Sequence, residues 1–131
     1  MIDVATLQGW IEKLGFSAEL HDPTTLLIRP PSRRGDPTGD IPPFYVQCTD
    51  NWVLLSILPI IEADDYFPRR GRKLLAQNRE MRLAKFALDK NGAIVLCAEL
   101  PTESLDRSEV VEAVERMVEY ARQFQANAPV G

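Results

Sequence analysis

The sequence has few of the side chains that catalysis and metal binding most often use. Its 131 residues include one histidine, His21, and two cysteines, Cys48 and Cys97. A lone histidine excludes a zinc site built on a histidine pair. Neither cysteine lies near His21 in the sequence, so a cysteine–histidine nucleophile is not indicated. The run RRGRK, Arg69–Lys73, lacks the spacing of a phosphate-binding P-loop. We therefore expect a protein that is not an enzyme and that holds no cofactor or metal.

Long apolar runs are also missing. The longest strongly apolar stretch, Trp52–Ile61, is far shorter than the roughly 20 residues that a membrane span needs. The first residues carry Asp3 and Glu12 and no apolar run behind a basic start, so we expect no signal peptide. Both cysteines sit in strand-like apolar patterns, which favours free buried thiols over a disulfide. Together these features predict a cytoplasmic protein.

Positive charge is in the minority but is locally concentrated. Fifteen Lys and Arg residues face nineteen Asp and Glu residues, which leaves a net charge of −4. A surface of that sign repels phosphate backbones, so nucleic-acid binding would need a separate basic face. The densest basic cluster consists of Arg69, Arg70, Arg72 and Lys73. This cluster could bind an anion, nucleic acid or an acidic partner segment. Alternatively, it is only a solvated helix start whose charge is balanced by Asp64 and Asp65.

Three segments have the 3.6-residue period of amphipathic helices. They are Asp3–Leu14, about Pro68 to Glu80, and Asp106–Phe124. Asp3 is a suitable N-cap of the first helix, and Gly15 follows where a left-handed residue ends a helix at least cost. Asp106 and Glu109 have the spacing of a capping box at the start of the third helix. The side chains of the second helix that can face a sheet are Leu74, Leu75 and Asn78.

The remaining segments predict three β-hairpins. In the first, a loop at Asp22-Pro23 places Leu20 opposite Leu26. In the second, a two-residue turn at Asp50-Asn51 places Val46 opposite Leu55, and leaves a second face that is not cleanly polar. That second face carries Tyr45, Gln47, Leu54 and Ser56.

The third hairpin turns at Asn91-Gly92, which suits the two positive-φ positions of a type I′ turn. This turn predicts that Phe86, Leu88, Val95 and Cys97 share one face of the hairpin. Both faces are apolar, so we expect one to meet the helices and the other to meet something else. The resulting order is α-ββββ-α-ββ-α, an α+β domain over residues 1–125 with an antiparallel sheet and helices mainly on one face. Residues 126–131 are expected to form a frayed tail.

A long segment, Pro30–Pro43, separates the first two hairpins. Its four prolines and two glycines preclude regular structure, and fourteen residues is long for a connection inside a compact domain. It is either a tolerated surface insertion or a binding element. The strand beside it is our candidate for a sheet edge to which a partner strand is added. Within it, Arg33 and Arg34 would steer an acidic partner segment.

The stretch LLAQNREMRLAKFALDKNGAIVLCAELP, residues 74–101, resembles the C-terminal half of YbjN-type bacterial proteins. The following LDRSEVVEAVERMVEYA, residues 105–121, completes the resemblance as a long amphipathic helix. YbjN-type proteins are relatives of the type III secretion chaperones. The resembling features are the Leu74, Leu75 and Asn78 helix end, the AKFALD strand, and the strand that ends in Leu100-Pro101.

The resemblance implies a non-enzymatic homodimer that binds segments of partner polypeptides. YbjN-type members are loosely described as regulators, and neither a membrane nor nucleic acid is the expected partner. The alternative is a regulatory protein that binds a small ligand or nucleic acid through the basic cluster. The residues that we expect to contact a partner are Arg33, Arg34, Tyr45, Trp52, Leu54, Arg69, Arg70, Arg72 and Lys73.

Overall fold

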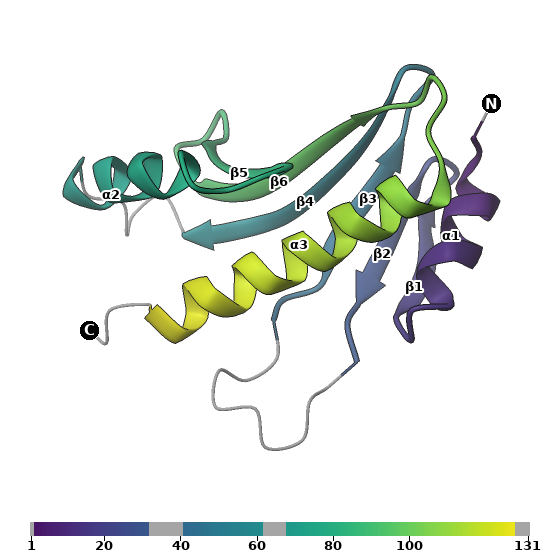
Figure 1. The fold of residues 1–131 in the computed structure, drawn as a ribbon, viewed down its shortest axis with the longest axis horizontal. Helices are drawn as coiled ribbons and strands as arrows, with labels where there is room; N and C mark the ends of the chain where they lie inside the picture. Colours follow the sequence, from purple (N-terminus) through teal and green to yellow (C-terminus); the bar gives the residue numbers. More distant parts are fainter. Residues whose placement is uncertain (1, 32–40, 62–67, 128–131) are drawn as a thin grey trace.

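A computed structural model describes residues 2–31, 41–61 and 68–127. The elements along the chain are α1 (Val4–Glu12), β1 (Ser17–Asp22), β2 (Thr25–Arg29), β3 (Phe44–Cys48), β4 (Trp52–Ile61), α2 (Pro68–Asn78), β5 (Ala84–Leu88), β6 (Ile94–Pro101) and α3 (Arg107–Asn127). This confirms the predicted order and the α+β class. The strands form one antiparallel sheet in the order β1-β2-β3-β4-β6-β5 (Figure 1).

The two helices α1 and α3 cover the same face of this sheet, and α3 crosses it diagonally (Figure 1). The core lies between these helices and the inward side chains of all six strands. Leu7 and Ile11 of α1 and Met117 of α3 are completely buried there, against strand residues such as Phe44 and Leu96. None of the helices among the described residues is long and apolar enough to cross a membrane.

Both covering helices begin at the predicted aspartate caps. Asp3 Oδ1 accepts a hydrogen bond from the Thr6 backbone N–H at 2.8 Å, and Asp106 Oδ1 accepts one from the Glu109 N–H at 2.9 Å. Each bond satisfies one of the backbone donors that a helix start leaves unpaired. Gly15 has a φ of 93°, the left-handed conformation predicted for the end of the first helix.

The predicted registers of the first two hairpins are confirmed. Leu20 pairs with Leu26 across β1 and β2, and Val46 pairs with Leu55 across β3 and β4. In the second hairpin the Thr49 N–H donates to the Trp52 carbonyl at 2.8 Å, so Asp50-Asn51 is the two-residue loop. The face that this register turns inward is therefore the apolar one.

The predicted register of the third hairpin is wrong by one residue. Leu88 pairs with Ile94 and Phe86 with Leu96, so these four side chains share the inward face, while Val95 and Cys97 lie on the other. The loop has three residues rather than two, because the Gly92 N–H bonds the Asp89 carbonyl and the Asp89 N–H bonds the Ala93 carbonyl. Of the loop residues only Gly92 has a positive φ, 88°, as in a type I turn followed by a left-handed glycine. A slip of one residue exchanges the two faces of a strand.

The predicted sheet edge is also wrong. Pro30–Pro43 is flanked by β2 and β3, and both strands are interior because each has a paired neighbour on either side. The edges are β1 and β5 instead. In β4 the pairing with β6 is irregular between Ile57 and Ile61, the part of the strand that contains Pro59, as expected where a residue lacks an N–H.

The junction between α2 and β5 is held by side chains bonded to the backbone. Asn78 Oδ1 accepts from the Phe86 N–H at 2.8 Å, and Asn78 Nδ2 donates to the Phe86 carbonyl at 3.0 Å. Lys85 Nζ donates to the carbonyls of Asn78 and Met81 at 2.6 and 2.7 Å, which satisfies acceptors at the end of α2. Asn78 therefore ties the end of α2 to the edge strand β5 through both backbone groups of Phe86.

We predict that Asn78→Ala lowers the free energy of unfolding by about 1–3 kcal/mol, because it leaves the Phe86 backbone groups without their partner. Urea titration followed by circular dichroism at fixed protein concentration measures this. Gln77→Ala, at an exposed position one residue away, is the control and should stay within about 0.5 kcal/mol of the unmodified protein. Equal losses in the two variants would contradict the role given to Asn78.

We also predict a pH-dependent contribution from the α3 cap. Hydrogen bonds from Glu109 and then Ser108 hold the pKa of Asp106 below its ordinary value of 3.8. A lowered native pKa stabilises the fold above the unfolded value, and this stabilisation is lost as pH falls through the native pKa. Asp106→Asn keeps a capping side chain but cannot ionise. Its deficit in unfolding free energy should therefore shrink on acidification.

Urea unfolding at a series of pH values tests the α3 cap. Glu115→Gln removes the same charge from an exposed position within α3 and serves as the control. A deficit of Asp106→Asn that is the same at neutral pH and well below pH 3.8 would show that ionisation of the cap does not stabilise the fold.

Candidate functional site

Three surfaces of the described residues combine exposure with apolar or concentrated charged side chains. The first is the sheet face that α1 and α3 leave uncovered, here called the open face. Tyr45 and Leu54 point to this face from β3 and β4, as does Trp52, which is 45% exposed. The structure thus brings together these three residues of the predicted partner-binding set. A row of paired residues crosses the open face through all six strands: Glu19, Leu27, Tyr45, Ser56, Cys97 and Lys85.

Side chains on the open face are polar at the β1 edge and more apolar toward the centre. His21 is exposed, and its ring meets the Tyr45 ring edge-on with 5.2 Å between centroids. Leu27, Tyr45 and Leu54 are each half-buried, although no helix among the described residues packs on them. A half-buried apolar strip of this kind is a contact surface for another chain when it is not covered by its own.

The two cysteines lie on opposite faces of the sheet and are both free thiols. Cys48 pairs with buried Val53 on the helix side, and Cys97 pairs with Ser56 on the open face. Each is half-buried rather than fully buried as predicted. Burial raises the pKa of both thiols, with a smaller effect from Glu99 at Cys97 and from Asp3 and Asp50 at Cys48. Thiols of this kind are poor nucleophiles at neutral pH.

The second surface is the basic end of the molecule, formed by α2, β5 and the connection between them. Residues 68–90 contain eight bases and only two acids, Glu80 and Asp89. Of the predicted cluster, Arg72 and Lys73 are exposed and Arg70 is half-buried on α2. The backbone of Arg69 belongs to the same helix, but its side chain lies outside the described residues. Arg33, Arg34, Asp64 and Asp65 also lie outside them, so their place relative to α2 stays untested.

A shallow apolar groove of about 150 Å³ runs between α2 and the β5–β6 hairpin within the basic end. Leu74 is buried at its floor, whereas Leu75, predicted to face the sheet, is 69% exposed at its wall. Leu88 lines the opposite wall and is 58% exposed. Leu88 is the last residue of β5, an edge strand of the sheet, and Leu75 lies across the groove from it. Sequence reasoning missed Leu88 as a groove residue because the register slip placed it with Val95 and Cys97.

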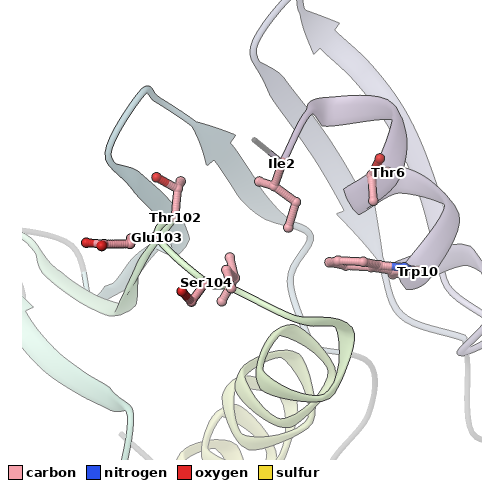
Figure 2. A pocket seen from close by; sticks show the side chains of 7 residues that line it. Ile2, Thr6, Trp10, Thr102, Glu103 and Ser104 are labelled. Carbon is pink, nitrogen blue, oxygen red and sulfur yellow. The ribbon is translucent and has the colours of Figure 1, made fainter.

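The third surface is a cleft of about 550 Å³ between α1 and the β6–α3 connection. Ile2, Thr6 and Trp10 line it from the N-terminal segment, and residues 102–105 line it from the other side (Figure 2). Ser104 holds a left-handed φ of 59° in this connection. No sequence signal joins these two segments, since they are about ninety residues apart and tertiary packing, including that of α1 on α3, brings them together.

The described residues contain no cluster of side chains that could hold a metal ion. No group of three or more His, Cys, Asp or Glu side chains converges within residues 2–31, 41–61 and 68–127. The one histidine, His21, contacts the Tyr45 ring at an exposed position of β1.

Three solved structures share this fold over almost the whole chain. The ExoU–SpcU heterodimeric complex from the type III secretion system of Pseudomonas aeruginosa matches at 19% identity and a TM-score of 0.63, covering 96% of each chain. YbjN from E. coli matches at 18% identity and a TM-score of 0.67, covering 95% of this chain and 92% of that one. The ExsC–ExsE complex matches at 14% identity and a TM-score of 0.59, covering 99% of each chain.

A comparison with family models gives one match, and a search among curated proteins finds none. The matched model is that of the Tir chaperone protein (CesT) family, and it spans residues 44–125, from β3 almost to the end of α3. Together with the YbjN and type III secretion structures, it confirms the predicted resemblance. The match covers more than half of the chain, and the chain belongs to the Tir chaperone protein (CesT) family.

Proposed function

We propose that the protein is a non-enzymatic, chaperone-like protein of the cytoplasm that binds a segment of a partner polypeptide as a homodimer. The observation that carries the proposal is the open face, where half-buried apolar side chains are covered by no helix among the described residues. Membership of a chaperone family supports it. So do two of the similar structures, ExoU–SpcU and ExsC–ExsE, which are complexes between two different proteins.

The partner segment docks on the open face in this proposal. Trp52 is the most exposed apolar residue there, with Leu54 next along the same face and Tyr45 on the neighbouring strand. Aromatic side chains of this kind give large contact area at low entropic cost and are frequent binding hot spots. An extended segment lies across such a strip by placing its apolar side chains between the strands.

The second copy docks at the groove between α2 and β5. This groove has two of the most exposed leucines in the described residues, Leu75 and Leu88, beside an unpaired strand edge. A two-fold axis through it would place Leu75 of each copy against the groove of the other. Such a contact removes both leucines from water, and burying each side chain fully would stabilise the dimer by about 1.5–3 kcal/mol.

A second candidate function rests on the basic end. Eight bases against two acids over residues 68–90 give the separate basic face that nucleic-acid binding requires in an acidic protein. A regulator of this kind would bind DNA or RNA with an affinity that falls steeply with salt. The polypeptide partner is favoured, because an apolar groove occupies the middle of the basic end and phosphate contacts do not need one.

We predict that Leu54→Glu weakens capture of the native partner about tenfold or more, since losing one buried leucine contact exceeds the 1.4 kcal/mol that a tenfold change represents. Affinity capture from native lysate identifies the partner, and titration with the purified partner measures the change. Gln47→Glu is the matched control, because it adds the same charge at the residue paired with Leu54 and removes no apolar surface.

Circular dichroism of each variant must show that the sheet is intact. Equal binding by Leu54→Glu and Gln47→Glu would remove the open face from the proposal. Turnover of a substrate that depends on His21 would overturn the non-enzymatic assignment itself.

We predict that light scattering at micromolar concentration gives twice the 14.8 kDa chain mass. Leu75→Glu should return the chain to monomer, because it would bury a charge in each of two symmetric contacts. Ala76→Glu adds the same charge at an exposed α2 position that does not line the groove, and should remain dimeric. A mass of 14.8 kDa for the unmodified protein at every concentration would contradict the homodimer.

A further inference from the structure

The cleft between α1 and the β6–α3 connection has an apolar floor and a polar rim. Ile2 and Trp10 supply the floor (Figure 2), together with Leu105, and each is only half-buried. Its volume of about 550 Å³ is more than three times that of the groove beside α2. An apolar floor of this size fits several side chains of a docking segment rather than one.

Most charged side chains around the cleft are acidic. Glu103 lines it directly, and Asp3 and Asp106 are the caps of the two helices that begin beside it. Asp50 is close as well, because its backbone carbonyl accepts a hydrogen bond from Thr102 Oγ1, at 2.8 Å, on the cleft wall. Among the described residues of these lining segments the nearest base in sequence is Arg107, the first residue of α3.

The two capping aspartates are ionised at neutral pH. Backbone hydrogen bonds from Thr6 to Asp3 and from Glu109 to Asp106 lower the pKa of each carboxyl group. They also fix where the negative charge lies, since each carboxylate is tied to the first turn of its helix. The rim therefore presents carboxylates at positions set by the fold.

We infer that this cleft binds a basic amphipathic segment of the partner polypeptide, with apolar side chains on the Ile2, Trp10 and Leu105 floor and Lys or Arg side chains at the acidic rim. The inference rests on the proposed function and names a second contact site for the same partner. It differs from the sequence prediction, in which basic residues steer an acidic segment. Complementary charge selects the partner and raises its association rate, and salt weakens it.

Trp10 makes the cleft observable by fluorescence. The chain has two tryptophans, so Trp52→Phe leaves Trp10 as the only one. This protein is titrated with a synthetic peptide whose leucines alternate with lysines, and with a second peptide in which glutamate replaces each lysine. We expect a saturable change in Trp10 emission with the lysine peptide, weakened by added salt, and none with the glutamate peptide.

Two variants of α1 test the position. Thr6→Arg puts a bulky positive charge on the cleft wall, and Ala5→Arg makes the same change at an exposed neighbour that does not line the cleft. We expect Thr6→Arg to weaken the lysine peptide about tenfold, a loss of 1.4 kcal/mol. Ala5→Arg should weaken it by no more than the twofold to fivefold of an exposed charge contact.

Several outcomes would overturn the inference. They are glutamate-peptide binding as tight as lysine-peptide binding, equal effects of the two arginine variants, and no response of Trp10 to either peptide. A second copy that places its own basic end in the cleft would also overturn it, and would appear as a mass that grows with concentration and falls in Thr6→Arg. A different result is that capture of the native partner is weakened by Leu54→Glu but unchanged by Thr6→Arg. That result would support the proposed function and would show that the cleft is not a contact site for the partner.

Discussion

A sheet of six strands has two faces, and helices α1 and α3 cover only one of them (Figure 1). Burial of the helix-covered face supplies the core, in which Phe44 and Leu96 are fully buried beneath α1 and α3. The strands nevertheless carry apolar side chains on both faces, as Leu54 and Leu55 show side by side in β4. Because backbone geometry turns neighbouring residues to opposite sides, the second set cannot reach the core.

The folds of single segments could be predicted where the signal was local. The Asp3 and Asp106 caps lie three residues from the N–H groups that they bind, so the spacing alone identifies them. The first hairpin keeps the predicted Leu20–Leu26 pair although its pairing shifts between Leu20 and Asp22, and the second has the predicted two-residue turn. The third failed because Asn91-Gly92 fits a two-residue turn, while the Asp89 side chain accepts from the Asn91 and Ala93 N–H groups and stabilises a loop of three.

The candidate surfaces likewise could be predicted where they depend on local pairing and could not where they depend on distant contacts. Tyr45 and Leu54 could be predicted together, because one hairpin register places them on one face. The sheet edge could not, because the order β3-β4-β6-β5 requires β6 to pair with a strand more than thirty residues earlier. The cleft at Trp10 depends on a packing contact between α1 and α3, which no periodic pattern encodes.

Charge is segregated along the molecule in a way that the net value conceals. The α2–β5 end is basic, whereas the helix starts around Trp10 are capped and rimmed by carboxylates. The groove at Leu75 shares no lining side chain with the cleft at Trp10 or with the strip of Tyr45, Trp52 and Leu54. In the proposed assembly, dimer formation and partner binding therefore use separate contacts, and substitutions at one surface should add to those at another. The proposed dimer would offer each docking surface twice, which would raise avidity for a long partner segment without any new contact.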